Sequence, residues 1–110
     1  MSLAPLPSRF VALPMGWALG FAVPVAVGFR SRLLGLSLLR RERAGPGLLL
    51  PRCRSVHTFG MRFPLDVVFL DAGGRAIRRV RLEPCRLAWE RRATAVLELP
   101  AGGAGAGGGV

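Results

Sequence analysis

The sequence predicts a small, mainly β domain: an antiparallel sandwich or barrel-like fold with one short α-helix. The chain has 110 residues, which is room for one hydrophobic core and no second domain. Short apolar segments follow one another at close spacing between turn residues, as is typical of antiparallel strands. Only residues 30–41 combine a broad leucine face with flanking arginines, which indicates an amphipathic helix.

Residues 10–29 form an uncharged run of 20 residues, long enough to cross a membrane as a helix. Pro14, Pro24 and several glycines interrupt this run. Residues 21–27 are also rich in Val, which suits an edge strand better than a helix interior. We therefore expect two short strands here and no membrane span, with a peripheral or spanning helix as the alternative.

The strands are clearest after residue 47. A new extended stretch begins at residues 48–50, and residues 66–71 read as a strand that is apolar on both faces and therefore central in its sheet. The segment Ala72-Gly73-Gly74 predicts a hairpin turn into a partner strand over residues 76–82. Leu87 and Trp89 share one face of a further short strand.

The last predicted strand lies before Pro100. Ala93, Ala95, Leu97 and Leu99 alternate there with Thr94, Val96 and Glu98, the pattern of a strand with one buried and one exposed face. The expected organisation is an apolar extension over residues 1–20, a domain over residues 21–101 and a flexible Gly- and Ala-rich tail over residues 102–110.

The formal net charge is +10, from 16 basic and 6 acidic residues. Every basic residue is Arg, and Lys, Asn, Gln and Tyr are absent, which indicates a G+C-rich coding sequence. The absence of Lys is therefore no sign of selection for the geometry of the guanidinium group. The charge is compatible with nucleic acid. Single-strand platforms need exposed aromatic rings among the charges, however, and Phe59, Phe63 and Phe69 are expected in the core. We therefore do not favour nucleic acid as the partner.

Side chains with reactive potential gather between Cys53 and Asp66, a block that holds the single histidine of the chain, His57. Cys53, His57 and Met61 recur every four residues and are soft-metal ligands suited to copper or zinc. Cys53 or Ser55 with His57 and Asp66 contains the residue types of a hydrolase. The structural alternative has His57 donate a hydrogen bond to Asp66 or to a backbone carbonyl and hold the loop against the central strand.

The block from Cys53 to Asp71 resembles the signature of the DUF192 (UPF0127) family, with its His57-Thr58, Met61-Arg62, Pro64 and Asp66-Val-Val-Phe69. The similarity continues on both sides, in residues 32–36 and in residues 96–102. The resemblance implies a compact, mostly β fold of sandwich type with a short helix, and it supplies no activity. Carried over by position, the motif residues of this chain are His57, Thr58, Met61, Arg62, Pro64 and Asp66.

We expect a non-catalytic binding or accessory domain with a site at His57, Thr58, Met61, Arg62 and Asp66. The alternative is a hydrolase-like enzyme or a soft-metal protein that uses Cys53, His57 and Asp66, with Met61 as a third metal ligand. No cofactor is expected, and the partner is an unidentified small ligand or protein. Two thiols without a convincing export signal favour free cysteines in the cytoplasm, with membrane association or export through the apolar N-terminus as the alternative.

Overall fold

The computed structural model describes residues 13–26 and 45–101, which form antiparallel β-sheets and contain no helix. The mainly β prediction is therefore confirmed. The helix predicted over residues 30–41 and the predicted tail over residues 102–110 lie outside the described residues. So do most residues of the predicted apolar extension.

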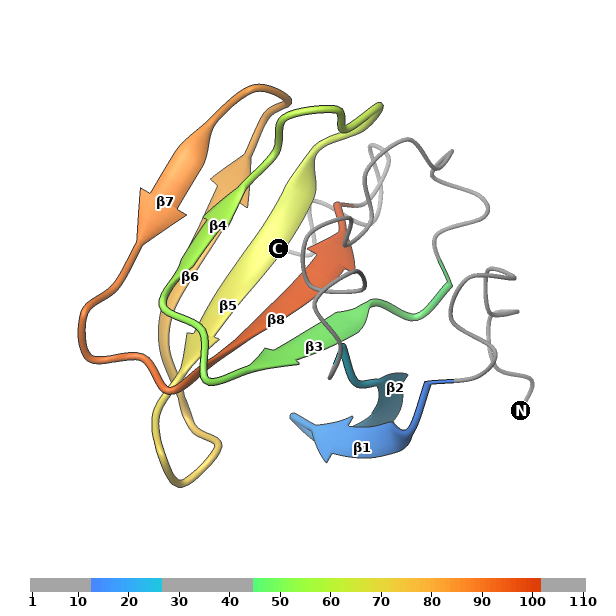
Figure 1. The fold of residues 1–110 in the computed structure, drawn as a ribbon, viewed down its shortest axis with the longest axis vertical. Helices are drawn as coiled ribbons and strands as arrows, with labels where there is room; N and C mark the ends of the chain where they lie inside the picture. Colours follow the sequence, from blue (N-terminus) through green and yellow to red (C-terminus); the bar gives the residue numbers. More distant parts are fainter. Residues whose placement is uncertain (1–12, 27–44, 102–110) are drawn as a thin grey trace.

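A four-stranded antiparallel sheet forms the centre of the fold (Figure 1). Its strand order is β3-β8-β5-β6, with β3 at Leu48–Pro51, β8 at Ala95–Pro100, β5 at Leu65–Leu70 and β6 at Ala76–Leu82. The predicted central strand is β5, which pairs with β6 on one side and with β8 on the other. The predicted turn joins β5 to β6, where an Asp71 Oδ1 accepts the N–H groups of Gly73 and Arg75, each at 2.9 Å.

Two short antiparallel pairs complete the fold. The first is the hairpin of β1 (Met15–Ala18) and β2 (Phe21–Pro24), so two short strands do stand where they are predicted. The second pairs β4 (Ser55–His57) with β7 (Leu87–Trp89). The strand β4 is not predicted from the sequence because it has only three residues and its partner is about thirty positions away.

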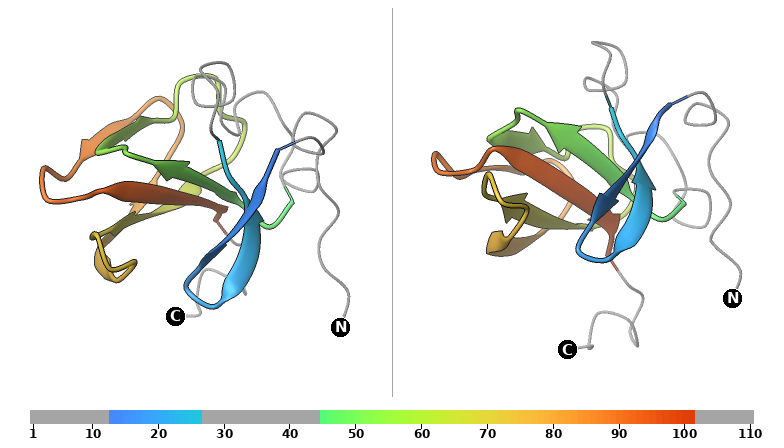
Figure 2. Two further views of the ribbon diagram at one scale, coloured as in Figure 1. Left: turned by 60° about the horizontal axis from the view of Figure 1, so that its bottom comes forward. Right: turned by 90° about the horizontal axis from the view of Figure 1, so that it is seen from below.

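The central sheet carries a hydrophobic core on each face. Figure 2 shows the β1–β2 hairpin, in blue, beside β3 and β8 of this sheet. Val67 and Phe69 of β5 pack on one face with Val56 of β4 and Ala88 of β7. Val68 and Leu70 of β5 pack on the other face with Val23 of the β1–β2 hairpin. The central sheet is thus covered by β4–β7 on one side and by β1–β2 on the other, and the described strands close no barrel.

The structure corrects two expectations from the sequence. β8 is not half-exposed: Val96, Leu97 and Glu98 are all buried, because β8 lies inside the sheet between two covering layers. Phe59 is not in the core and is 55% exposed, whereas Phe63 and Phe69 are buried as predicted. Alternation along a strand identifies its two faces but does not tell how many layers cover them.

Candidate functional site

Within the segment from Cys53 to Asp66, Thr58 is the residue held by several hydrogen bonds to a distant turn. Its side chain is fully buried at the end of β4, and its hydroxyl donates a hydrogen bond to the Glu83 carbonyl oxygen at 2.6 Å. The same hydroxyl accepts the Arg86 N–H at 2.7 Å. The Thr58 backbone N–H donates to the Arg86 carbonyl at 2.8 Å, and its carbonyl accepts the Cys85 N–H at 3.0 Å. Thr58 therefore holds the turn at residues 83–86 against the end of β4.

That turn has a backbone conformation that side chains other than glycine rarely adopt. Cys85 has a φ of 66°, in the left-handed region. Such a residue persists where surrounding contacts determine its conformation, and here Thr58 supplies the contacts. The turn leads directly into β7, so the bonds of Thr58 set the position of β7 relative to β4.

The outer side of the β4–β7 pair exposes apolar and aromatic side chains. The inward residues are Val56 and Ala88, so the alternate residues of both strands point away from the core. Leu87 lies opposite His57 and is 57% exposed, and Trp89 is 64% exposed. The ring of exposed Phe59 stacks on that of His57, with centroids 5.1 Å apart. We call these four side chains the aromatic face: His57, Phe59, Leu87 and Trp89.

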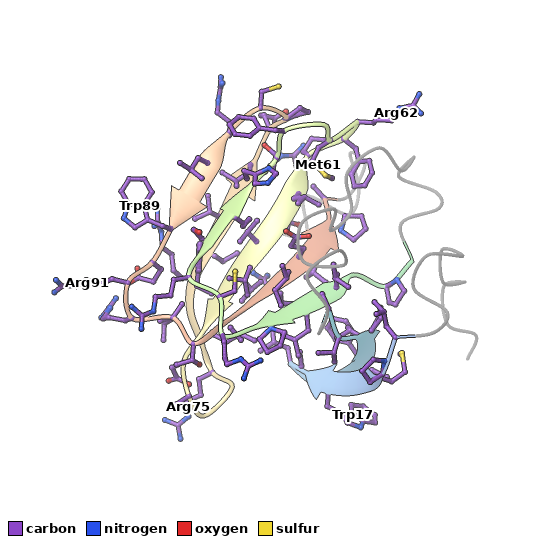
Figure 3. All side chains as sticks on the ribbon, in the orientation of Figure 1. Trp17, Met61, Arg62, Arg75, Trp89 and Arg91 are labelled. Atoms are coloured by element: carbon purple, nitrogen blue, oxygen red, sulfur yellow. The ribbon has the colours of Figure 1, made fainter. Side chains whose placement is uncertain are left out.

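An open hollow of about 440 Å³ adjoins the aromatic face, between β7 and the edge strand β6. Apolar side chains line it from both strands, and Arg78 and Arg91 add positive charge. The Arg78 Nη1 donates to the Trp89 carbonyl at 2.8 Å, which links β6 to β7. Figure 3 shows Trp89 and Arg91 projecting on the same side of the molecule, far from Trp17 and Arg62.

The charge around the aromatic face is positive. Glu90 forms an ion pair with Arg92 at 3.1 Å, and hydrogen bonding from Arg92 lowers the pKa of Glu90, which keeps that carboxylate ionised and neutralised. Glu83 is paired with Arg81 at 3.2 Å. Within residues 13–26 and 45–101, no carboxylate forms a salt bridge with Arg54, Arg86 or Arg91. These three arginines lie at the ends of β4 and β7 and leave an uncompensated positive rim.

The structure separates the predicted site residues. His57 is exposed, Thr58 and Met61 are buried, and Arg62 is exposed at another part of the surface (Figure 3). Asp66 is on the face of β5 that carries Val68, which is the side covered by β1–β2, whereas β4 covers the opposite side. Among the described residues, no hydrogen bond joins His57 to Asp66; the Nδ1 of His57 accepts the Phe59 N–H at 3.3 Å.

The predicted soft-metal ligands also face different surroundings. Met61 is in the core cluster with Val56, while His57 is on the outer side of β4. The Cys53 Sγ donates to the Ser55 carbonyl at 3.0 Å. Cys53 and Cys85 are both free, as expected. In the part of the chain that the structure describes, no three His, Cys, Asp or Glu side chains group as they would around a metal ion.

Glu98 is a second unusual group, and it lies inside the sheet. It is 5% exposed in β8, opposite Leu48 of β3 and Val67 of β5, and both of these partners are fully buried. Its Oε1 has no hydrogen-bond partner among the described residues. Burial raises the pKa of Glu98 from 4.5 to about 7, because the ionised carboxylate loses its hydration there.

Sequence reasoning missed the exposure of Phe59 and the burial of Glu98. A Phe beside an apolar strand is ordinarily core, and only the chain reversal at residues 59–60 turns this ring outward. For Leu87 and Trp89 the sequence did identify a shared face. The sequence did not indicate that this face is exposed, because the residue between them, Ala88, is too small to mark the other face as the buried one.

The family-model comparison matches residues 13–108 to DUF192, described as an uncharacterised family (Uncharacterized ACR). The chain belongs to the DUF192 family, as its central block indicates. Comparison with curated proteins and with solved structures yields no match for this chain. Within the described residues, no helix has the length and apolar character needed to cross a membrane.

Proposed function

We propose that the protein is a non-catalytic binding domain whose ligand site is the aromatic face and the adjoining hollow. The proposal keeps His57 from the predicted site as a contact residue. It gives Thr58 and Met61 structural roles, because both are buried. Arg62 and Asp66 remain predicted motif residues whose roles the proposal does not use.

One observation carries the proposal: large apolar side chains are exposed on two strands whose positions are fixed by the hydrogen bonds of the buried Thr58. Soluble proteins bury Phe, Leu and Trp where they can, and a group of such residues exposed together marks an interaction site. Here Thr58 fixes the two strands that present these side chains, through hydrogen bonds of its hydroxyl and its backbone to residues 83–86. Pre-positioned apolar groups bind without a large ordering cost. A cytoplasmic location stays part of the proposal, since free thiols are typical of a reducing compartment.

The test is amide chemical-shift mapping on the full chain. Nucleoside monophosphates, aromatic carboxylates and acidic peptides are titrated separately into ¹⁵N-labelled protein. We expect at least one class to bind with its largest shift changes in residues 55–59 and 86–91. Thr58→Val should weaken that binding, because the turn at residues 83–86 loses the hydroxyl bonds that help to position β7 against β4. If every class binds elsewhere, or none binds, the proposed site is wrong.

A further inference from the structure

We infer that the partner of the aromatic face is single-stranded nucleic acid, bound by base stacking on the exposed rings and by phosphate contacts to the arginine rim. The inference rests on the proposed function, and it names the partner of that same site. It reverses the sequence-based preference against nucleic acid, because the premise of that preference, a buried Phe59, is wrong.

The first support is the geometry of the exposed rings. His57 and Phe59 are already stacked, with a centroid separation of 5.1 Å and an interplanar angle of 23°. Trp89 lies at the other end of the same face, opposite Ser55, and Leu87 lies opposite His57. His57, Phe59 and Trp89 are all exposed, and unpaired bases of any sequence can stack on exposed aromatic rings.

The second support is charge complementarity. The chain carries a net charge of +10, and both acidic residues near the face are paired with arginines. Arg54, Arg86 and Arg91 border the aromatic face without a carboxylate partner among the described residues. A flexible strand can place its bases on the rings while its phosphates reach this rim.

The same geometry disfavours a duplex and a membrane surface. Bases in a duplex are stacked inside the helix, so a duplex could engage the arginines and would leave Phe59 and Trp89 unused. An anionic bilayer would also attract the arginines, and apolar side chains of any exposed segment could insert into it. Trp17 is such a residue: it is 75% exposed on β1, within residues 13–26, which hold no charged residue. Trp17 therefore serves as a matched control for Trp89.

The experiment is fluorescence anisotropy with the full chain and a labelled twelve-nucleotide oligothymidylate. The comparison probes are a twelve-base-pair duplex and vesicles of neutral and anionic phospholipid. We expect the single strand to bind more tightly than the duplex. Trp89→Ala and Phe59→Ala should each weaken single-strand binding by roughly 5- to 150-fold, the effect of losing one stacked base. Trp17→Ala should leave it within about twofold.

A salt series separates stacking from charge. Contacts to about three phosphates predict a slope near −2 in log affinity against log salt, and Arg91→Ala should reduce its magnitude by about 0.7. Trp89→Ala should leave the slope unchanged while it lowers the affinity. In the Trp17→Phe variant, where Trp89 is the single tryptophan, the oligonucleotide should quench Trp89 emission.

Three results would overturn the inference. Equal loss of affinity in Trp89→Ala and Trp17→Ala would mean apolar contact that is not specific to the aromatic face. Equal affinity for duplex and single strand, insensitive to both ring substitutions, would mean phosphate recognition without stacking. Binding to anionic vesicles that depends on Trp89, without binding to the oligonucleotide, would identify a membrane surface. In each case, if another ligand class changes the chemical shifts of residues 55–59 and 86–91, the proposed binding site holds with a different ligand. If no ligand class changes those shifts, both the nucleic-acid partner and the proposed site are rejected.

Discussion

Thr58 and Arg86 exchange hydrogen bonds in both directions, although 28 positions separate them in the chain. The Arg86 N–H donates to the Thr58 hydroxyl at 2.7 Å, and the Thr58 N–H donates to the Arg86 carbonyl at 2.8 Å. Since Thr58 is completely buried, water cannot replace these bonds. The pair fixes the distance between the two strands that carry the aromatic face.

Thr58→Val should therefore destabilise the protein by about 2–3 kcal/mol, because it leaves the Glu83 carbonyl and the Arg86 N–H without their buried partner. Denaturant unfolding measures this loss as a lower midpoint. The matched control is Thr94→Val, since Thr94 is an exposed residue and the bond from its hydroxyl to the Leu70 carbonyl is long, at 3.4 Å. A cost for Thr94→Val equal to that for Thr58→Val would contradict the role assigned to the buried hydroxyl.

Glu98 should make the stability of the protein depend on pH. Its folded-state pKa of about 7 lies above the ordinary 4.5, so the folded protein keeps a proton that the unfolded chain releases between these values. The free energy of unfolding should fall as the pH rises from about 4.5 through 7, by about 3 kcal/mol at roughly 1.4 kcal/mol per pH unit.

Glu98→Gln tests this dependence, because the amide does not titrate. We expect the stability difference between the variant and wild type to shift in favour of the variant by about 3 kcal/mol between pH 4 and pH 8. Urea unfolding at several pH values measures it. A constant difference across this range would show that Glu98 does not hold its proton in the fold.

Gly47 should be intolerant of any side chain. Its φ is +128°, and an added Cβ would come within 2.6 Å of the Glu98 carbonyl oxygen and 2.8 Å of the Leu99 Cδ2. Gly74 also has a positive φ, +81°, but no atom lies within 4 Å of an added Cβ. We expect Gly74→Ala to cost about 1 kcal/mol and Gly47→Ala at least about 2 kcal/mol more. Thermal unfolding of both variants measures the difference, and equal costs would refute the close approach.

Titration with Cu(I) and Zn(II) tests the predicted ligand set of Cys53, His57 and Met61. From the observed placement, with Met61 in the core and His57 on the outer side of β4, we expect no stoichiometric binding that His57→Ala abolishes. His57→Ala should also change the melting temperature little, because the ring is exposed. Tight binding at one ion per chain, lost in His57→Ala, would restore the metal-site hypothesis.

The strands of this protein were predictable where local pattern and turn chemistry agree. The run from Asp66 to Asp71 is apolar at every position between its ends, and Asp71 with two glycines specifies the reversal, so β5 and β6 follow from residues 65–82. The hairpin near Trp17 was also predictable, since proline and glycine exclude a long helix there. By contrast, β4 depends on a partner far away in the chain, and three residues carry too little pattern to predict it.

The candidate site was predictable only as a segment. The residues from Cys53 to Asp66 identified the family and contained His57 and Thr58, but their reactive side chains do not converge. Leu87 and Trp89 join His57 through the pairing of β4 with β7, and the turn at Cys85 brings them there. Because His57 lies far from Leu87 and Trp89 in the chain, the sequence did not indicate that these residues are neighbours.

The amino-acid sequence by itself determined the mainly β class, the family and the position of the central strand, because each depends on residues adjacent in the chain. The tertiary structure decided which faces are covered. Two layers pack on the central sheet, so Glu98 is buried in a strand whose pattern predicts exposure. Trp89 is exposed because Ala88 occupies the buried side of β7, and Phe59 is exposed because the chain turns at residues 59–60, beyond β4. Burial depends on contacts between distant segments, and a local pattern cannot specify these.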